Sequence, residues 1–465
     1  MPATPVIAVF DVGKTNKKLF LFDEQYQIVF ERSAKFTETV DEDGDACENL
    51  ESLRLSVFDS LREVFNKKEF EVKAINFSTY GASFVYINEG GQPVAPLYNY
   101  LKAFPAELQE KFYADYGGED EVSRRTASPV LGNLNSGMQV YRIKQQKPEL
   151  FAQTKWALHL PQYMSYILSG HACSDITSIG CHTNLWDFEA NNYHPWVQQE
   201  GIAEKLAPVE ACDTVVRAFF PGNNLKVGIG LHDSSAALIP YLLHFQEPFV
   251  LISTGTWCIS LNPFNASPLT VEELHQDCLC YLTYKGDPVK AARVFAGYEH
   301  ELQTKRIAEH FNVSPSFFRS MPFDPEVYAA IEGKESLQQA ADATGKVLKE
   351  SPFAQRDLSL YANEEEAYHQ LIADLVHLQY ASTSLVLQGS TVKRIFVDGG
   401  FSKNNIYMNL LAAAFPGMEV YAASMAQATA MGAALVLHKH WNPKPIPSNI
   451  IELEYYHLTP SNALS

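Results

Sequence analysis

Residues 8 to 23 read AVFDVGKTNKKLFLFD, and this stretch decides the fold. Two apolar runs flank a Gly-Lys-Thr triplet, a pattern that predicts a β-hairpin with Gly13 at its tip. The triplet also ends many phosphate-binding loops of the Walker type, but those loops need a glycine five residues before the Gly-Lys pair and a helix directly after it. Here the glycine position is Ala8, and NKKLFLF favours a strand, so we reject a Walker loop.

The tip of this hairpin nevertheless suits a phosphate ligand. Gly13 permits a tight turn that brings backbone N–H groups close to a ligand. The tip carries short polar and basic side chains: Lys14, Thr15, Asn16, Lys17 and Lys18. Asp11, at the end of the first strand, could hold Mg²⁺ directly or through water. Taken alone, an ordinary exposed hairpin with lysines on an edge strand explains the same residues more simply.

A second stretch, PFVLISTGTWCISLN at 248–262, has the same form, with Gly255 and Thr256 at its tip. A length of 465 residues allows two or three domains. One matching hairpin opening each half suggests two related domains, 1–240 and 241–465. Near the C-terminus a strand, a glycine turn, a helix, a strand and a helix follow in order, which predicts an α/β domain.

Composition excludes several classes of function. The net charge is 36 − 54 = −18, which argues against nucleic-acid binding but leaves room for a locally positive phosphate site. No segment is long and apolar enough to cross a bilayer, and MPATPVIAVFD reads as a first strand, not as a signal peptide. The seven cysteines, an odd number, predict free thiols in a reducing cytoplasm.

The segment KVGIGLHDSSAALIPYLL at 226–243 places Asp233 where a strand meets a helix. A carboxylate there can accept a proton from a substrate hydroxyl, and His232 could hydrogen-bond the same substrate. A simple helix N-cap is the alternative role for Asp233. A further turn, VDGGFSKN at 397–404, sets Gly399 and Gly400 before a helix N-terminus, where adenosine or phosphate could dock.

Other segments yield secondary-structure expectations. Apolar spacing predicts a helix near 46–66, and the region that begins with DPVKAARVF at 287 is expected to be helical. LPQYMSYILSG at 160–170 is expected to be a helix that Gly170 stops. Asn363 is expected to cap a helix that begins with three glutamates. EDGDACE at 42–48 is expected to be a solvated acidic turn, since its spacing is wrong for a calcium loop.

Taken in order, these motifs resemble the FGGY family of carbohydrate kinases over nearly the whole chain. STYGASFVYINEGGQPV, LHDSSAA and STGTWCIS are most similar to the rhamnulokinases of that family. The resemblance implies an α/β protein of two ribonuclease H-like domains of the actin and hexokinase ATPase type, with a cleft between them. It further implies a cytoplasmic enzyme that uses ATP and Mg²⁺, with a homodimer as one option.

The resemblance also implies residue roles. Asp233 would be the general base, and Gly81 and His232 would contact the sugar together with it. Asp11 would position Mg²⁺. The ATP-binding residues would be Gly13, Lys14, Thr15, Asn16, Lys17, Gly255, Thr256, Gly400, Phe401 and Asn404. The best-matching reaction is phosphorylation of L-rhamnulose at O1, with L-fuculose, xylulose and ribulose as alternative acceptors.

Two departures leave the sugar open. Many family members have Thr or Ser where this chain has Lys14. Rhamnulokinases carry Tyr-Arg-Asp-x-Arg where this chain reads LYNYLKAF at 97–104. A sugar-binding regulator that has lost catalysis remains an alternative on the same fold, although the retained Asp11 and Asp233 speak against it. A chaperone or filament protein of the same superfamily has no support, because no long substrate-binding module follows the ATPase core.

Overall fold

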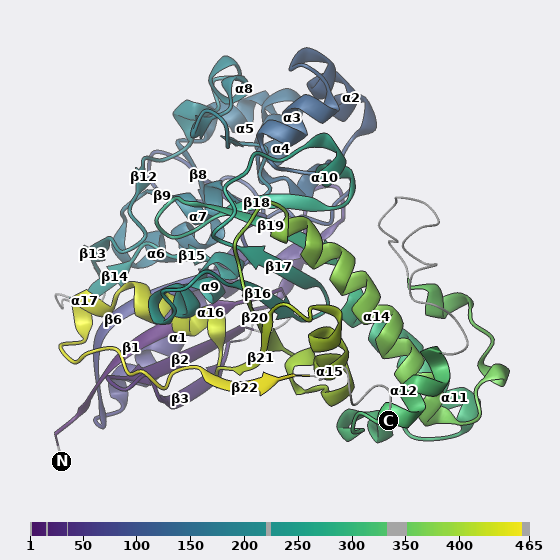
Figure 1. The fold of residues 1–465 in the computed structure, drawn as a ribbon. Coiled ribbons are helices and arrows are strands. Elements are labelled where there is room, and N and C mark those ends of the chain that lie inside the picture. The colour runs from purple at the N-terminus through teal and green to yellow at the C-terminus, as the bar shows by residue number, and fades with distance from the viewer. Residues whose placement is uncertain (1, 15–16, 35, 220–224, 333–350, 458–465) are drawn as a thin grey trace.

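The computed structural model describes residues 2–14, 17–34, 36–219, 225–332 and 351–457. Thr15 and Asn16, both predicted to bind ATP, lie outside the described residues. Two sheets, each with helices packed on its faces, make up two lobes (Figure 1).

The first sheet has the hairpin at its centre. β1 (Thr4–Val12) pairs antiparallel with β2 (Lys17–Asp23) and parallel with β6 (Phe70–Thr79). The strand order is β13-β14-β6-β1-β2-β3, and β15 (Leu231–His232) pairs parallel with the end of β6. The remaining strands are β3 (Ile28–Ser33), β13 (Val215–Arg217) and β14 (Lys226–Gly228). The predicted hairpin is confirmed. Its second strand, β2, begins at Lys17, where a Walker loop would need a helix.

The second sheet repeats the central arrangement. β16 (Val250–Thr254) pairs antiparallel with β17 (Cys258–Asn262) and parallel with β20 (Arg394–Gly399). The strand order is β18-β19-β17-β16-β20-β21-β22. The outer strands are β18 (Cys278–Leu282), β19 (Pro288–Val294), β21 (Glu419–Ser424) and β22 (Glu452–Tyr456). A hairpin flanked by a parallel strand therefore stands at the centre of both sheets.

Two helices lie between the sheets, α9 (Asp233–His244) and α16 (Ala428–Val436) (Figure 1). They touch so closely that a Cβ on Gly432 would lie 1.8 Å from the carbonyl oxygen of Ala236. α16 also shares an apolar core with the first sheet, to which Ile7 and Val9 contribute. A C-terminal helix thus packs on the N-terminal sheet and ties the lobes together.

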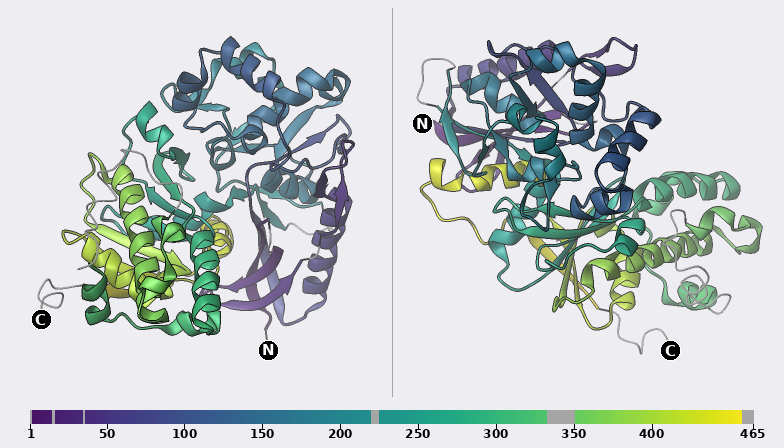
Figure 2. Two further views of the ribbon diagram at one scale, coloured as in Figure 1. Left: turned by 90° about the vertical axis from the view of Figure 1, so that its right-hand side faces the viewer. Right: turned by 90° about the horizontal axis from the view of Figure 1, so that it is seen from above.

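A group of short helices and strands from about 84 to 206 extends the first lobe at one end (Figure 2). Within it β7 (Phe84–Ile87) pairs with β8 (Trp156–His159), and α2 (Ala106–Asp115) and α4 (Ser136–Gln146) surround an aromatic core centred on Trp196. α6 (Leu160–Ser169) follows β8 and ends at Gly170, as predicted. Gly170 has a φ of +66°, in the left-handed region that favours glycine. In the described parts of the chain, no helix combines the length and apolar character needed to cross a membrane.

Two expected helices begin later than predicted. Residues 46–48 form a strand, β5 (Ala46–Glu48), and α1 (Leu50–Asn66) starts after the cap Asn49. The segment after 287 begins as strand β19, and the helix α11 (Ala296–Phe311) follows it. Both errors have one cause: a strand without a clear alternation of buried and exposed positions cannot be separated from a helix by its pattern. The Asn363 cap of α14 (Glu364–Leu387) is confirmed.

Candidate active site

The register of the first sheet brings Asp11, Gly81 and Asp233 to one edge. Asp11 in β1 lies opposite Ser78 in β6, and His232 in β15 lies opposite Thr79. The carboxyl ends of three neighbouring parallel strands therefore meet, and each carries or is followed by a predicted site residue. Such edges are where α/β sheets bind ligands.

Asp233 is the first residue of α9, and its side chain is 29% exposed. Its Oδ1 accepts from the backbone N–H of Ser234 at 2.6 Å and lies 3.3 Å from His232 Nε2. None of the described residues donates a hydrogen bond to Oδ2. One oxygen is thus fixed while the other keeps its lone pairs, which is what a general base requires.

The surroundings of Asp11 disfavour the ionised form of its carboxyl group. Burial raises its pKa from 3.8 to about 6; the hydrogen bond that Thr429 Oγ1 donates at 2.8 Å opposes the rise, and the negative charge of Asp233 adds to it. The partly buried carboxylate of Asp11, near the negative charge of Asp233, offers oxygen donors that suit a divalent cation such as Mg²⁺. The fit concerns Asp11, because the described residues contain no cluster of three or more His, Cys, Asp or Glu side chains placed to share a metal ion.

His232 lies directly against Gly81. A Cβ on Gly81 would stand 2.5 Å from His232 Cδ2, so any larger residue at position 81 would displace the imidazole. His232 Nε2 is also 3.2 Å from the Sγ of Cys181, a buried thiol whose pKa is raised by burial. The ring of Tyr281 lies 5.9 Å from the imidazole and comes from the second lobe. The two predicted sugar-contact residues are therefore in contact and face the other lobe.

The lysines of the first hairpin meet a carboxylate that the sequence analysis did not single out. Glu48 is 4% exposed, and its Oε1 lies 3.0 Å from Lys17 Nζ and 4.0 Å from Lys14 Nζ. Lys14 Nζ also lies over the rings of Tyr80 and Tyr100, at 5.8 and 5.4 Å from their centroids. Lys14 therefore extends from the hairpin tip toward the residue that precedes Gly81.

A separate cavity of about 440 Å³ collects the predicted nucleotide residues of the second lobe. Five of the predicted ATP contacts line it: Gly255, Thr256, Gly400, Phe401 and Asn404. The second sheet builds it, since Thr254 lies opposite Gly399 in the register of β16 and β20. Gly400 and Phe401 both donate backbone N–H bonds to Thr254, at 3.0 Å each.

The opposite wall of this cavity comes from α11 and α14. A Cβ on Gly297 would stand 1.8 Å from the carbonyl oxygen of Gly255, so only glycine fits at this contact. Tyr368 accepts a hydrogen bond from Asn404 at 2.9 Å and lies 2.8 Å from His300 Nε2. Sequence reasoning missed this wall because its residues follow a strand that was predicted to be helix. The Gly297-Tyr298 pair after VFA was the only local signal.

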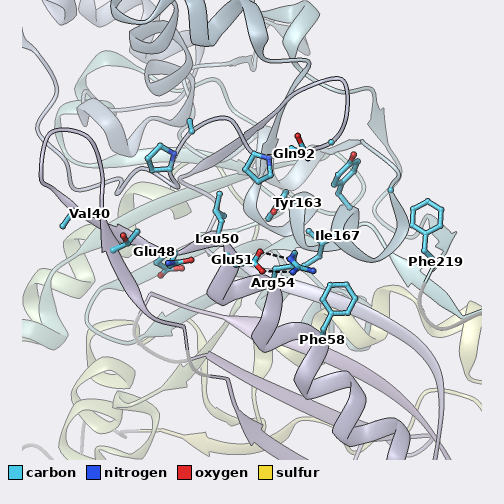
Figure 3. A pocket seen from close by; sticks show the side chains of 18 residues that line it. Val40, Glu48, Leu50, Glu51, Arg54, Phe58, Gln92, Tyr163, Ile167 and Phe219 are labelled. Atoms are coloured by element: carbon cyan, nitrogen blue, oxygen red, sulfur yellow. Dashed lines mark hydrogen bonds and ion pairs between the residues drawn. The ribbon is translucent and has the colours of Figure 1, made fainter.

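A larger cavity of about 770 Å³ lies elsewhere, between α1, α6 and the turn at 91–96 (Figure 3). Its described lining contains none of the predicted site residues. Figure 3 shows the Glu51–Arg54 ion pair among aromatic side chains there, with Glu48 at one side. Glu48 thus separates this cavity from the lysines of the hairpin, and the cavity itself is not the candidate site.

The strand order and the paired hairpins define a two-lobed protein with similar α/β sheets. The profile for the N-terminal domain of the FGGY family of carbohydrate kinases matches residues 6–235, and that for the FGGY carbohydrate kinase C-terminal domain matches residues 246–445. The chain belongs to the FGGY family of carbohydrate kinases.

Individual relatives are distant. A rhamnulokinase from Mannheimia succiniciproducens is 23% identical over 275 residues, which cover 54% of this chain and 52% of that protein. The chain spans about half the length of the curated relatives it matches. A crystal structure of a carbohydrate kinase from Novosphingobium aromaticivorans matches with a TM-score of 0.79 and 24% identity, covering 98% of this chain and 94% of that one. A ligand-bound xylulose kinase from Lactobacillus acidophilus matches with a TM-score of 0.76 and 16% identity, covering 99% and 95%. At these identities the structural likeness shows the fold.

Proposed function

We propose that this protein is an ATP-dependent sugar kinase that transfers the γ-phosphoryl group of ATP to a hydroxyl of a ketose. The observation that carries the proposal is the position of Asp233: fixed through Oδ1 at the start of α9, with Oδ2 free, beside Asp11 and the contact between Gly81 and His232. Residues 1–240 would carry the sugar side and residues 241–465 the adenosine side.

In this proposal the residues divide the work of phosphoryl transfer. Asp233 Oδ2 takes the proton of the attacking sugar hydroxyl, and Gly81 and His232 orient the sugar. Gly13 and Lys17 hold phosphate oxygens from one hairpin, and Gly255 and Thr256 hold them from the other. Phosphoryl transfer depends on such positioning and charge neutralisation more than on covalent chemistry.

The remaining groups serve the nucleotide. Gly400, Phe401 and Asn404 line the cavity proposed for adenosine. Asp11 would hold Mg²⁺, which supplies positive charge against the phosphates when bound. Arg319 and Lys403 also line that cavity and add positive charge near its mouth.

The acceptor proposed first is L-rhamnulose, phosphorylated at O1. The named rhamnulokinases among the relatives support this choice, and the xylulose kinases among the matching structures support another ketose as the alternative. All seven cysteines are free thiols, which fits the proposed cytoplasmic location.

A coupled ADP-release assay tests the proposal. The full chain is mixed with Mg-ATP and, one at a time, with L-rhamnulose, L-fuculose, xylulose and ribulose. We expect ADP release that depends on one of these ketoses, with the phosphorylated sugar detected by mass spectrometry. Binding of Mg-ADP with no ketose-dependent release from any of them would contradict the proposal and favour a regulator.

A further inference from the structure

A buried acid of the first lobe has no role in the function proposed above. Glu48 ends β5, and its backbone bridges to Leu97, at the start of the segment that departs from the rhamnulokinase pattern. A buried carboxylate is costly unless cations are close to it. Lys17 and Lys14 are those cations, and both come from the tip of the first hairpin.

The two lysines are held differently. Lys17 Nζ is 3.0 Å from Glu48 Oε1, whereas Lys14 Nζ is 4.0 Å away and its side chain is 30% exposed. The tighter pair thus belongs to Lys17. At 4.0 Å the charge of Glu48 attracts the Lys14 ammonium without accepting a short hydrogen bond from it, so the N–H groups of Lys14 stay available to a ligand.

The surroundings of Lys14 point to the sugar side of the site. Its ammonium lies over Tyr80 and Tyr100, whose rings meet edge to face at 5.7 Å. Tyr80 directly precedes Gly81, which contacts His232. The pKa of Tyr100 is raised by burial first and then by the charge of Asp233.

The departure from the rhamnulokinase pattern has a structural counterpart here. Lys102, near the position of that pattern's last arginine, has a side chain only 6% exposed and pairs with Asp41, Asp43 and Asp45 at 2.6 to 2.9 Å. Its charge is therefore taken up by the acidic turn, and 97–102 contains no other basic residue. Lys14 is a basic side chain that lies over the two tyrosine rings beside Gly81.

We propose that Lys14 is a specificity-determining residue for the sugar, and that Glu48 is the positioning residue that holds it there. The proposal rests on the assignment of the sugar to Gly81 and His232. It names the substrate class as a neutral polyhydroxylated ketose, whose C–H face packs on Tyr80 and Tyr100 and whose hydroxyl oxygen accepts from Lys14. An anionic sugar acid is disfavoured, because Asp11 and Asp233 lie at the same strand ends.

Calorimetric titration of the full chain tests the role of Lys14. Mg-ADP and each of the four ketoses, L-rhamnulose, L-fuculose, xylulose and ribulose, are titrated into wild type and Lys14→Met. A hydrogen bond from a charged group corresponds to about tenfold or more in affinity. We expect Lys14→Met to weaken the best-bound ketose by about that factor and to change Mg-ADP binding less than about threefold.

Lys73→Met is the matched control. Lys73 lies on β6, the strand that ends at Thr79 just before Tyr80. Its side chain is 39% exposed and pairs with the exposed Glu71. We expect its ketose affinity to equal that of wild type. A Lys14→Met variant that loses Mg-ADP affinity and keeps ketose affinity would overturn the proposal, as would a wild type that binds Mg-ADP and none of the ketoses.

A double-mutant cycle separates positioning from general structural support. Glu48→Gln keeps the shape of the side chain and removes the charge that holds Lys14, so it should weaken ketose binding in the wild-type background. In the Lys14→Met background the same change should have no further effect on ketose affinity. Equal losses in both backgrounds would overturn the role of Glu48.

The binding assay and the turnover assay test the Lys14 inference and the kinase function separately. Ketose binding that depends on Lys14, without any ketose-dependent ADP release, would contradict the kinase function and leave the Lys14 inference standing. Ketose-dependent ADP release with a ketose affinity indifferent to Lys14→Met would do the reverse.

Discussion

Replacing Asp11 by asparagine should stabilise the ligand-free protein at neutral pH and abolish its function. The pKa of Asp11 rises from 3.8 to about 6 because the carboxylate is buried beside Asp233. Between these pH values the folded state binds more protons than the unfolded state, so stability falls as pH rises through that window. The asparagine side chain has nearly the same shape and no charge, and Thr429 can still donate to its amide oxygen.

The magnitude follows from linkage. At about 1.4 kcal/mol for each pKa unit, the ionised carboxylate of Asp11 costs about 3 kcal/mol at pH 7.5 and about 1 kcal/mol at pH 4.5. We therefore expect Asp11→Asn to raise the free energy of unfolding by up to about 3 kcal/mol at pH 7.5. At pH 4.5 the gain should be about 2 kcal/mol smaller.

Urea unfolding followed by tryptophan fluorescence at the two pH values measures this difference, with EDTA present and nucleotide absent. Asp59→Asn is the control, because Asp59 is 56% exposed and its carboxylate pairs with Arg62 of the same helix. Mg-ADP should stabilise wild type more than Asp11→Asn, since the cation offsets a charge that the variant lacks. An Asp11→Asn variant that is less stable than wild type at pH 7.5, or whose effect does not change with pH, would refute the reasoning.

Two further predictions concern the frame of the site. Lys102→Met leaves the buried Asp41 without its cation and should cost about 3–5 kcal/mol in urea unfolding at pH 7, more than Lys73→Met. The pKa of Asp41 is lowered, because the hydrogen bonds from Lys102 and from the backbone N–H groups of Asp45 and Asp43, with the Lys102 charge, together outweigh its burial. The wild-type contribution is therefore present at neutral pH and is lost as pH falls below about 4; an unchanged acid transition in Lys102→Met would contradict this. Gly297→Ala drives a methyl group into the carbonyl of Gly255 and should lower the free energy of unfolding by about 1–3 kcal/mol, as overpacking predicts. Since Gly255 must shift to admit the methyl group, Mg-ADP binding should also weaken in calorimetry. Gly417→Ala, whose Cβ would meet nothing within 4 Å, is the control, and equal affinities for the two variants would show that the Gly297–Gly255 contact does not shape the nucleotide site.

The sequence predicted the turns, caps and helix ends of the fold, because single residues within a few positions determine them. Both hairpins, the Asp233 junction, the α6 stop at Gly170 and the Asn363 cap each depend on a turn or cap residue within a few positions of a periodic segment. The strands β5 and β19 were missed because neither alternates clearly between buried and exposed positions.

The candidate site was predicted in part for the same reason. Asp11, Asp233 and the glycine turns lie near the ends of strands and helices, and such ends can be recognised in the sequence. No local pattern marks Glu48 or Lys102, because their roles come from ion pairs between segments 31 and 57–61 residues apart. EDGDACE was expected to be a solvated acidic turn, and residues 42–46 are exposed. The sequence spacing did not show that the preceding Asp41 is 5% exposed or that Asp41, Asp43 and Asp45 pair with Lys102.

The catalytic role of Asp233 is the claim on which the rest depends, and turnover of Asp233→Asn tests it most directly. An asparagine side chain can still accept from the N–H of Ser234, so α9 keeps its first hydrogen bond while the base is lost. General-base assistance accounts for about 10²–10⁴-fold in rate, so ketose-dependent ADP release should fall by that factor while Mg-ADP affinity in calorimetry stays within about twofold of wild type. An Asp233→Asn variant that releases ADP at the wild-type rate with the same ketose would contradict the account.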